Sequence, residues 1–358
     1  MNPGDNALTL GRKLIARSIT TIALLLAAPA TAQMQGGAPL SIGESYLINS
    51  ETLGGERIVT VRLPAEYDAD PEARFPVVYL LDGGPEQDFA HIAGIAQSRE
   101  MNGTFAPFIL VGIQSTDRRH FFTPPAADVA AYEEALAATP GGSATYREFL
   151  RYELKPLVEA SFRTNGRSAV IGESLGGLFV VETLLRDPTL FDDYIAISPS
   201  MWWEAMQFGR EAAGYLDAMP AGERRLYLTV ANEGFWHREG MERLVDALRD
   251  HAHADLQWTY VPVGDSETHD SIFHPMALDA FRTLYGTPWQ EYQPDYLISG
   301  LQPRARTAAE NAMLETPCTR ENSRPTTPEA TSEARERLYY ECLLLDLGPR
   351  AREGTLRN

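Results

Sequence analysis

The sequence predicts an α/β fold in which a mostly parallel central sheet carries helices on both faces. Between about Ser41 and Gly286, short apolar runs alternate with helical patterns at the spacing of a doubly wound domain. Several of these runs are continuously apolar, which is typical of strands that are covered on both faces. One domain of this length is reasonable, so we assign residues 41–286 to a single unit.

The individual elements follow from the same patterns. Seven runs are predicted as strands: Glu56–Leu63, Pro76–Leu81, Phe108–Ile113, Ser168–Ile171, Asp193–Ser198, Arg225–Ala231 and Gln257–Val263. Four helices are expected between or after them: Thr145–Phe162, Leu175–Arg186, Met241–Ala252 and Pro275–Tyr285. This order is the one expected of an α/β hydrolase.

The N-terminal segment has the pattern of a secretory signal peptide. Three basic residues precede an apolar run, Ile19–Ala28, and the small residues Ala30 and Ala32 follow it. The run is too short to span a bilayer, so we expect residues 1–32 to be removed by cleavage after Ala32 and the mature protein to be periplasmic or extracellular. A retained membrane anchor is the alternative.

The net charge and the two cysteines bear on the partners and the stability of the protein. The net charge is −18, which argues against nucleic acid or an anionic membrane as a partner. Residues 287–358 are predicted to be an extension with a Pro-rich stretch and a helix over Pro328–Leu347. It holds Cys318 and Cys342, the chain's two cysteines, which we expect to form a disulfide in an exported protein. The oligomeric state is not predicted.

The most informative stretch is Ser168–Gly177, where an apolar run leads into Gly172-Glu-Ser-Leu-Gly176 and then into a helical pattern. A strand, a sharp turn and a helix in this order form a nucleophile elbow, which lifts a serine hydroxyl above the sheet. Ser174 is therefore the candidate nucleophile.

A serine nucleophile needs a histidine base and an acid, which follow it along the chain in this fold. His269 lies in the loop after the last strand run and is the preferred base, with His274 and His237 as lesser candidates. Glu233 follows the strand run ending at Ala231 and is the preferred acid. Asp265 and Asp270 are alternatives, and Glu233 could simply cap a turn.

The oxyanion of a tetrahedral intermediate needs two hydrogen-bond donors. The backbone N–H of Leu175, directly after the nucleophile, is one candidate. Gly83 or Gly84, at the end of the Pro76–Leu81 run, would supply the other, because glycine lets the backbone approach the reacting carbonyl. An ordinary glycine-rich turn is the alternative.

No metal or cofactor is implied by the sequence. The histidines are scattered without the spacing of metal ligands, and no glycine-rich nucleotide loop follows a strand. Trp202 and Trp203 could form an apolar wall for an acyl or aromatic group, although core packing is equally compatible with their position. Arg118 and Arg119 could attract an anionic substrate, or could pair with acidic residues of the protein.

Several motifs together resemble the putative esterase family of α/β hydrolases, which includes siderophore esterases, esterase D and feruloyl esterases. They are Arg57–Pro64, Pro76–Gly83, Ile171–Gly177, Ser198–Trp203 and Thr268–Ser271. By this resemblance Ser174 and His269 carry over as nucleophile and base, Glu233 as the acid, and Gly83 or Gly84 with Leu175 as the oxyanion hole. The stretch Ser198–Trp203 looks most like the siderophore-esterase branch, and the tail after Gly286 is expected to lie outside the family pattern.

The sequence thus predicts an exported serine hydrolase that cleaves a small-molecule carboxylic ester through an acyl-enzyme, with a siderophore-type or aromatic acyl ester as substrate. Two alternatives stay open. The same three residues would support acyl transfer to an alcohol other than water. A protein that kept the fold but only binds a ligand is the alternative outside the enzymes.

Overall fold

The computed structural model describes residues 36–286. The predicted signal peptide, the extension after Gly286 and the predicted disulfide between Cys318 and Cys342 lie outside the described residues. The account below concerns the unit that begins at Ile42.

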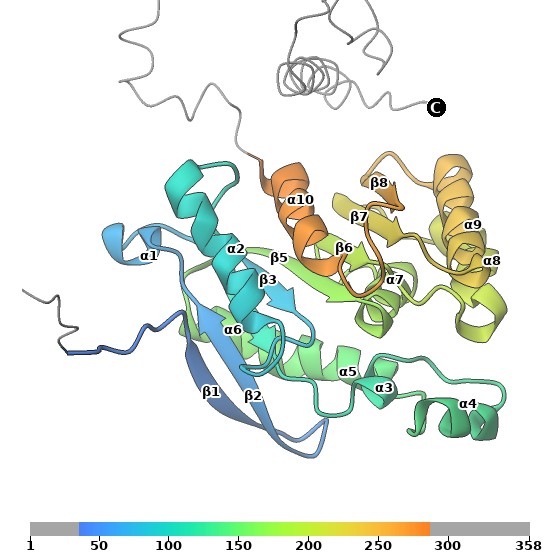
Figure 1. Ribbon diagram of the computed structural model, residues 1–358, viewed down its shortest axis with the longest axis horizontal. Helices are drawn as coiled ribbons and strands as arrows, with labels where there is room; N and C mark the ends of the chain where they lie inside the picture. Colours follow the sequence, from blue (N-terminus) through green and yellow to red (C-terminus); the bar gives the residue numbers. More distant parts are fainter. Residues whose placement is uncertain (1–35, 287–358) are drawn as a thin grey trace, which may run out of the picture. The chain divides into compact units, whose positions relative to one another are not determined.

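An eight-stranded sheet forms the centre of this unit, with strand order β1-β2-β4-β3-β5-β6-β7-β8 (Figure 1). β2 pairs antiparallel with β1 and with β4, whereas all pairs from β4 to β8 are parallel. The strands are β1 (Glu44–Ser50), β2 (Gly55–Arg62), β3 (Phe75–Leu80), β4 (Ile109–Ile113), β5 (Thr164–Glu173), β6 (Asp193–Ile197), β7 (Arg224–Ala231) and β8 (Leu256–Gly264).

Helices cover both faces of this sheet and bury two separate apolar layers. One layer holds Phe89 and Phe281, from the two helices that lie together on one face, α2 and α10 (Figure 1). The other holds Phe179, Phe208 and Leu244, from α7, α8 and α9. The helices are α1 (Glu66–Ala69), α2 (Phe89–Asn102), α3 (Arg118–Phe121), α4 (Val129–Leu136), α5 (Ser143–Phe149), the π-helix η1 (Leu150–Leu154), α6 (Lys155–Ser161), α7 (Leu175–Arg186), α8 (Trp203–Asp217), α9 (Phe235–His251) and α10 (Phe273–Tyr285).

The predicted fold class is confirmed, and each of the seven predicted strands overlaps an observed one. β4 and β6 are buried at every position, as their continuous apolar sequences indicate. β1 was not predicted, because it is an edge strand whose side chains are mostly exposed and whose sequence has no clear alternation. Between residues 36 and 286, no helix combines the length and the apolar character needed to cross a membrane.

The helix predictions were accurate where the chain is strongly amphipathic or apolar and less so elsewhere. Helix α7 has the predicted bounds, Leu175–Arg186. The single helix expected over Thr145–Phe162 is interrupted by the wider turn of η1. α9 begins at Phe235, before the predicted start at Met241, so its first turn comes close behind the candidate acid Glu233.

The junction of β5 and α7 depends on glycines at positions where no side chain fits. A Cβ built on Gly172 would lie 2.6 Å from the carbonyl carbon of Gly176, in the first turn of α7. A Cβ on Gly177 would lie 2.9 Å from the Cα of Pro199, in the loop after β6. The strand, the helix and the neighbouring loop therefore approach each other at backbone distance, which fixes the turn that carries Ser174.

Replacing Gly172 with alanine should destabilise the protein by about 1–3 kcal/mol, because the added methyl group overlaps backbone that cannot move independently. Gly214→Ala in α8 is the matched control, since a Cβ there meets no atom within 4 Å and alanine favours the helix. Urea unfolding of both variants measures the difference. Equal stability of the two variants would contradict the close approach described above.

Candidate active site

Ser174 occupies a strained backbone conformation between β5 and α7. Its φ is +57° and its ψ is −118°, in a region that non-glycine residues rarely adopt. Backbone hydrogen bonds hold it there: its N–H donates to Ile197 O at 3.1 Å, and its carbonyl accepts from Ser200 N and Leu178 N, each at 2.9 Å. Such strain persists only where the surroundings enforce it, and it is concentrated at functional sites.

The loop after β6 connects this serine with the candidate acid. Ser200 Oγ lies 3.4 Å from Ser174 Oγ, and Ser198 Oγ donates a hydrogen bond to Glu233 Oε1. Ser198 has a positive φ of 43°, so this loop is also under backbone constraint. The stretch Ser198–Trp203 marks the family resemblance, and only its tryptophans were assigned a role from the sequence. The position of the two serines at the end of a strand was the available signal for these contacts.

Glu233 follows β7 and is the centre of a cluster of hydrogen-bonding groups. Its side chain is only 5% exposed, with His237 Nδ1 2.5 Å from Oε2 and His269 Nδ1 3.1 Å from Oε1. Burial by itself would raise the pKa of this carboxyl group. The close contacts with the two imidazoles and the hydrogen bond from Ser198 outweigh burial and lower the pKa to about 2, so the group is a carboxylate at neutral pH.

His269 lies in the loop after β8, with its side chain partly exposed. The close contact with the Glu233 carboxylate raises the pKa of this imidazole, against the opposing effect of burial. Because Nδ1 faces the carboxylate, Nε2 is the nitrogen available to accept a proton. Glu233, and not the alternatives Asp265 or Asp270, is the acid that faces Nδ1.

The three candidate residues share one edge of the sheet. β5, β6, β7 and β8 run parallel, so Ser174, Glu233 and His269 all follow the carboxyl ends of neighbouring strands. In open parallel sheets this is the edge at which ligands bind.

Glu173, the residue before the candidate nucleophile, was not singled out by the sequence analysis. Burial raises the pKa of its carboxyl group to about 7; the charges of His269 and Arg118 partly offset this effect, whereas Asp88 and Asp82 add to it. His269 is therefore within electrostatic range of the elbow. A glutamate that titrates near neutral pH beside a serine and a histidine can change the charge of the site.

Comparison with known proteins adds to this geometry. A family model described as a putative esterase matches residues 50–334. The chain belongs to this esterase family. Family membership makes it a hydrolase that acts on esters, as the resemblance implied. The match continues past Gly286, so the expectation that the family pattern ends there was wrong.

Two curated relatives of the esterase are named for siderophores. This chain is 26% identical over 230 residues to the siderophore triacetylfusarinine C esterase of Aspergillus fumigatus, and the match covers 60% of this chain and 75% of that protein. It is 34% identical over 153 residues to the ferri-bacillibactin esterase BesA of Bacillus subtilis, covering 37% of this chain and 50% of that protein.

A solved structure shares the fold. The crystal structure of an IroE-like serine hydrolase from Shewanella oneidensis superposes with a TM-score of 0.62 at 24% identity, over 84% of this chain and 99% of that chain. At this level of identity the likeness concerns the fold.

The three backbone N–H groups predicted to bind the oxyanion differ in the acceptors they have in this structure. Leu175 is the first residue of α7, where backbone N–H groups have no acceptor within the helix. The Gly83 N–H donates to Ile113 O at 2.9 Å, and the Gly84 N–H donates to the side-chain oxygen of Gln87 at 3.0 Å. Of the two glycines, only Gly84 has an acceptor that a side-chain rotation could remove.

The predicted aromatic wall is divided between the site and the core. Trp203 is fully buried, with its ring centroid 4.3 Å from that of Tyr132, so it packs in the core as the alternative described. Trp202 is only partly buried, and its ring centroid lies 6.3 Å from that of His237. Trp202 is therefore the tryptophan of this pair that borders the site.

The predicted anion-binding arginines have partners within the protein. Arg118 forms an ion pair with Asp82 at 3.0 Å, and Arg119 donates to the carbonyl of Leu136 at 2.7 Å. Of the two interpretations open for Arg118, substrate binding or pairing with an acidic residue of the protein, the structure shows the pairing. Arg118 also reaches the Glu173 carbonyl at 3.5 Å, so it links the loop after β3 to the elbow.

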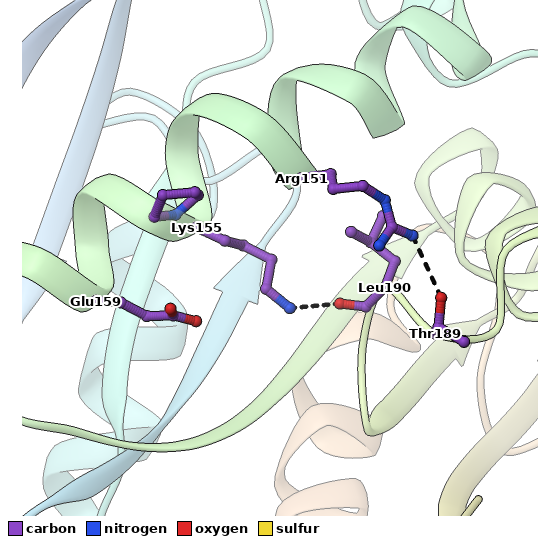
Figure 2. A pocket seen from close by; sticks show the side chains of 6 residues that line it. Arg151, Lys155, Glu159, Thr189 and Leu190 are labelled. Atoms are coloured by element: carbon purple, nitrogen blue, oxygen red, sulfur yellow. Dashed lines mark hydrogen bonds between the residues drawn. The ribbon is translucent and has the colours of Figure 1, made fainter.

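A cavity of about 140 Å³ lies elsewhere, between η1, α6 and the loop before β6 (Figure 2). Lys155 Nζ donates there to the Leu190 carbonyl and to Ser168 Oγ, in the middle of β5. Burial lowers the pKa of this lysine to about 8. None of the residues that line this cavity belongs to the candidate site, so the two are separate, and Lys155 serves to join α6 to the sheet.

Ionisation of Glu173 above about pH 7 should destabilise the folded protein, and we expect Glu173→Gln to remove this loss of stability. The pKa of Glu173 is about 7 in the folded protein and near 4.5 when unperturbed, so the folded state binds more protons between these values. The contribution of this group to stability is fully present below pH 4.5 and is lost as the pH rises through 7. Glutamine should therefore add about 1–3 kcal/mol at pH 8 relative to wild type and little at pH 4.

Urea unfolding at several pH values measures this effect, with the exposed Glu148→Gln as the control. A gain at pH 8 no larger in Glu173→Gln than in the control would contradict the shifted pKa.

Proposed function

We propose that this esterase is an exported serine hydrolase that cleaves a carboxylic ester through an acyl-enzyme, with Ser174, His269 and Glu233 as its catalytic triad. The observation that carries the proposal is the buried Glu233 carboxylate, which faces Nδ1 of His269 at the sheet edge where the strained Ser174 lies. An acid in this position selects the tautomer whose Nε2 can take the serine proton.

In this mechanism Ser174 Oγ attacks the ester carbonyl while His269 accepts the hydroxyl proton. His269 then gives that proton to the departing alcohol, and a water molecule repeats the sequence to release the acid. The charge on the imidazolium that forms is stabilised by Glu233, whose low pKa keeps it ionised throughout.

The N–H groups of Leu175 and Gly84 would hold the oxyanion in the tetrahedral intermediates. Gly84 is preferred to Gly83, because the Gly83 N–H is bonded to a strand carbonyl. For Gly84 to act, the Gln87 side chain must release it, since Gln87 Oε1 accepts from Gly84 N at 3.0 Å and from Ser115 N at 3.1 Å.

A siderophore-type or aromatic acyl ester is the proposed substrate. The two curated relatives described above are named as esterases of siderophores. Trp202 lies next to His237, which contacts the triad acid, and would provide a flat apolar surface for an aromatic acyl group. The proposed export follows from the basic and apolar pattern of residues 1–32.

Ser174→Ala should lower kcat by at least about 10³-fold on every ester that the wild type hydrolyses, because the nucleophile is lost. Glu233→Gln should lower kcat by about 10²–10⁴-fold, because it leaves His269 in the wrong tautomer. The assay uses p-nitrophenyl acetate, p-nitrophenyl ferulate and a catecholate trilactone, with Ser98→Ala in α2 as the control. Full activity of Ser174→Ala would refute the proposal, and predominant transfer of the acyl group to an added alcohol would replace hydrolysis with acyl transfer.

Trp202→Ala should lower kcat/KM for p-nitrophenyl ferulate about tenfold while changing that for p-nitrophenyl acetate less than twofold. The two esters share a leaving group, so the comparison isolates the acyl side, and stacking on an indole ring contributes about 0.5–1.5 kcal/mol. Tyr152→Ala, in the exposed part of η1, is the control. Equal losses on both esters would assign Trp202 a structural role.

A further inference from the structure

A group of three metal-ligating side chains lies where α2 and α10 begin. Asp88 is the residue before α2, His91 is in its first turn, and His274 is in the first turn of α10. His91 Nδ1 and His274 Nε2 each lie 3.1 Å from the same carboxylate oxygen, Asp88 Oδ1. The two imidazole rings are 4.5 Å apart between centroids.

The geometry is close to what one cation requires. One ligand atom from each of the three side chains lies within 4.8 Å of the other two. Metal–nitrogen and metal–oxygen bonds of about 2.0–2.2 Å place neighbouring ligand atoms about 3–4 Å apart, so only small side-chain rotations are needed. His91 and His274 are 61% and 46% exposed, which leaves an entry path and open coordination positions.

The donor set and the surrounding charge both favour a divalent transition metal. Imidazole nitrogens suit zinc, copper and nickel better than calcium or magnesium, which prefer oxygen ligands. The carboxyl groups of Asp82 and Glu173 are within electrostatic range of Asp88. Asp82 is paired with Arg118, whereas Glu173 adds negative charge when it is ionised.

We propose that Asp88, His91 and His274 bind one divalent transition-metal ion, of which zinc is the representative. The ion ties the start of α2 to the start of α10. α2 follows the loop after β3 that contains Gly84, and α10 follows the loop after β8 that contains His269. β3 and β8 lie on opposite sides of β5 in the strand order, so a bound ion links loops from both sides of the strand that precedes Ser174. The proposal concerns metal binding and stands independently of the proposed esterase mechanism.

The sequence does not reveal this site, because His274 and Asp88 are 186 positions apart and only the packing of α10 against α2 brings them together. The spacing of the histidines along the sequence implies no metal. Spacing can detect only ligands that lie near one another in the sequence, whereas these ligands are brought together by the tertiary structure.

Isothermal calorimetry of the untagged full chain with ZnCl₂ tests the proposal. We expect one zinc ion to bind wild type, and His91→Ala and His274→Ala each to weaken binding at least tenfold. Zinc at about 100 times its Kd should raise the Tm of wild type by about 5 °C and that of His274→Ala by much less. His251→Ala is the matched control, because His251 also faces a single carboxylate, that of Asp217 at 2.9 Å, but among the described residues it belongs to no group of three metal-ligating side chains.

His237→Ala distinguishes this site from the cluster around Glu233, which also brings two histidines to one carboxylate. Binding that survives His237→Ala and His251→Ala but is lost in His91→Ala and His274→Ala supports the proposal. The absence of zinc binding by wild type at 1 mM, or binding that persists in both His91→Ala and His274→Ala, would overturn it.

Discussion

The candidate site depends on the burial of one carboxylate. Removing Glu233 from water is costly, and a buried charge is tolerated only when partners satisfy it. Here the partners come from three separate elements: Ser198 from the loop after β6, His237 from the first turn of α9 and His269 from the loop after β8. The group that gives His269 its orientation therefore also fixes the relative positions of these three elements.

The proposed nucleophile, Ser174, is held by a second set of contacts, which includes the same loop after β6 that contacts Glu233. Ser174 keeps its strained backbone through bonds to Ile197 and Ser200, and glycines allow β5, α7 and the loop after β6 to approach at backbone distance. Since Ser198 contacts Glu233 and Ser200 contacts Ser174, this short loop is the physical connection between the proposed acid and the proposed nucleophile. Preorganisation of this kind is what lets a site act on developing charge without rearranging.

Electrostatics around the elbow extend beyond the proposed triad. Glu173 is half-buried next to Ser174, and its charge acts on His269, so the ionisation of one group depends on that of the other. Arg118 holds Asp82 and reaches the carbonyl of Glu173, which joins the glycine loop after β3 to the elbow. An arginine that the sequence offered as a substrate contact thus belongs to the support of the site.

The sequence by itself determined the elements and residues that depend on chain neighbours. Continuous apolar runs identified the buried strands. The sequence Gly172–Gly176 between a strand and a helix pointed to Ser174 as the candidate nucleophile, and at Gly172 the close approach of α7 admits only glycine. The preferred acid, Glu233, and base, His269, came from their positions after strand runs, since parallel strands bring their carboxyl ends to one edge. The edge strand β1 and the π-helical turn η1 could not be predicted in this way, because neither produces a distinct apolar periodicity in the sequence.

Only the tertiary structure decided which side chains meet. It buried Trp203 and left Trp202 beside His237, gave Glu233 a second histidine, engaged the Gly83 and Gly84 N–H groups, and brought His91 and His274 to Asp88. The physical reason is that these contacts join loops and helix ends from distant parts of the chain. Their geometry follows from strand order and from how helices pack on the sheet, neither of which is encoded in the spacing of neighbouring residues.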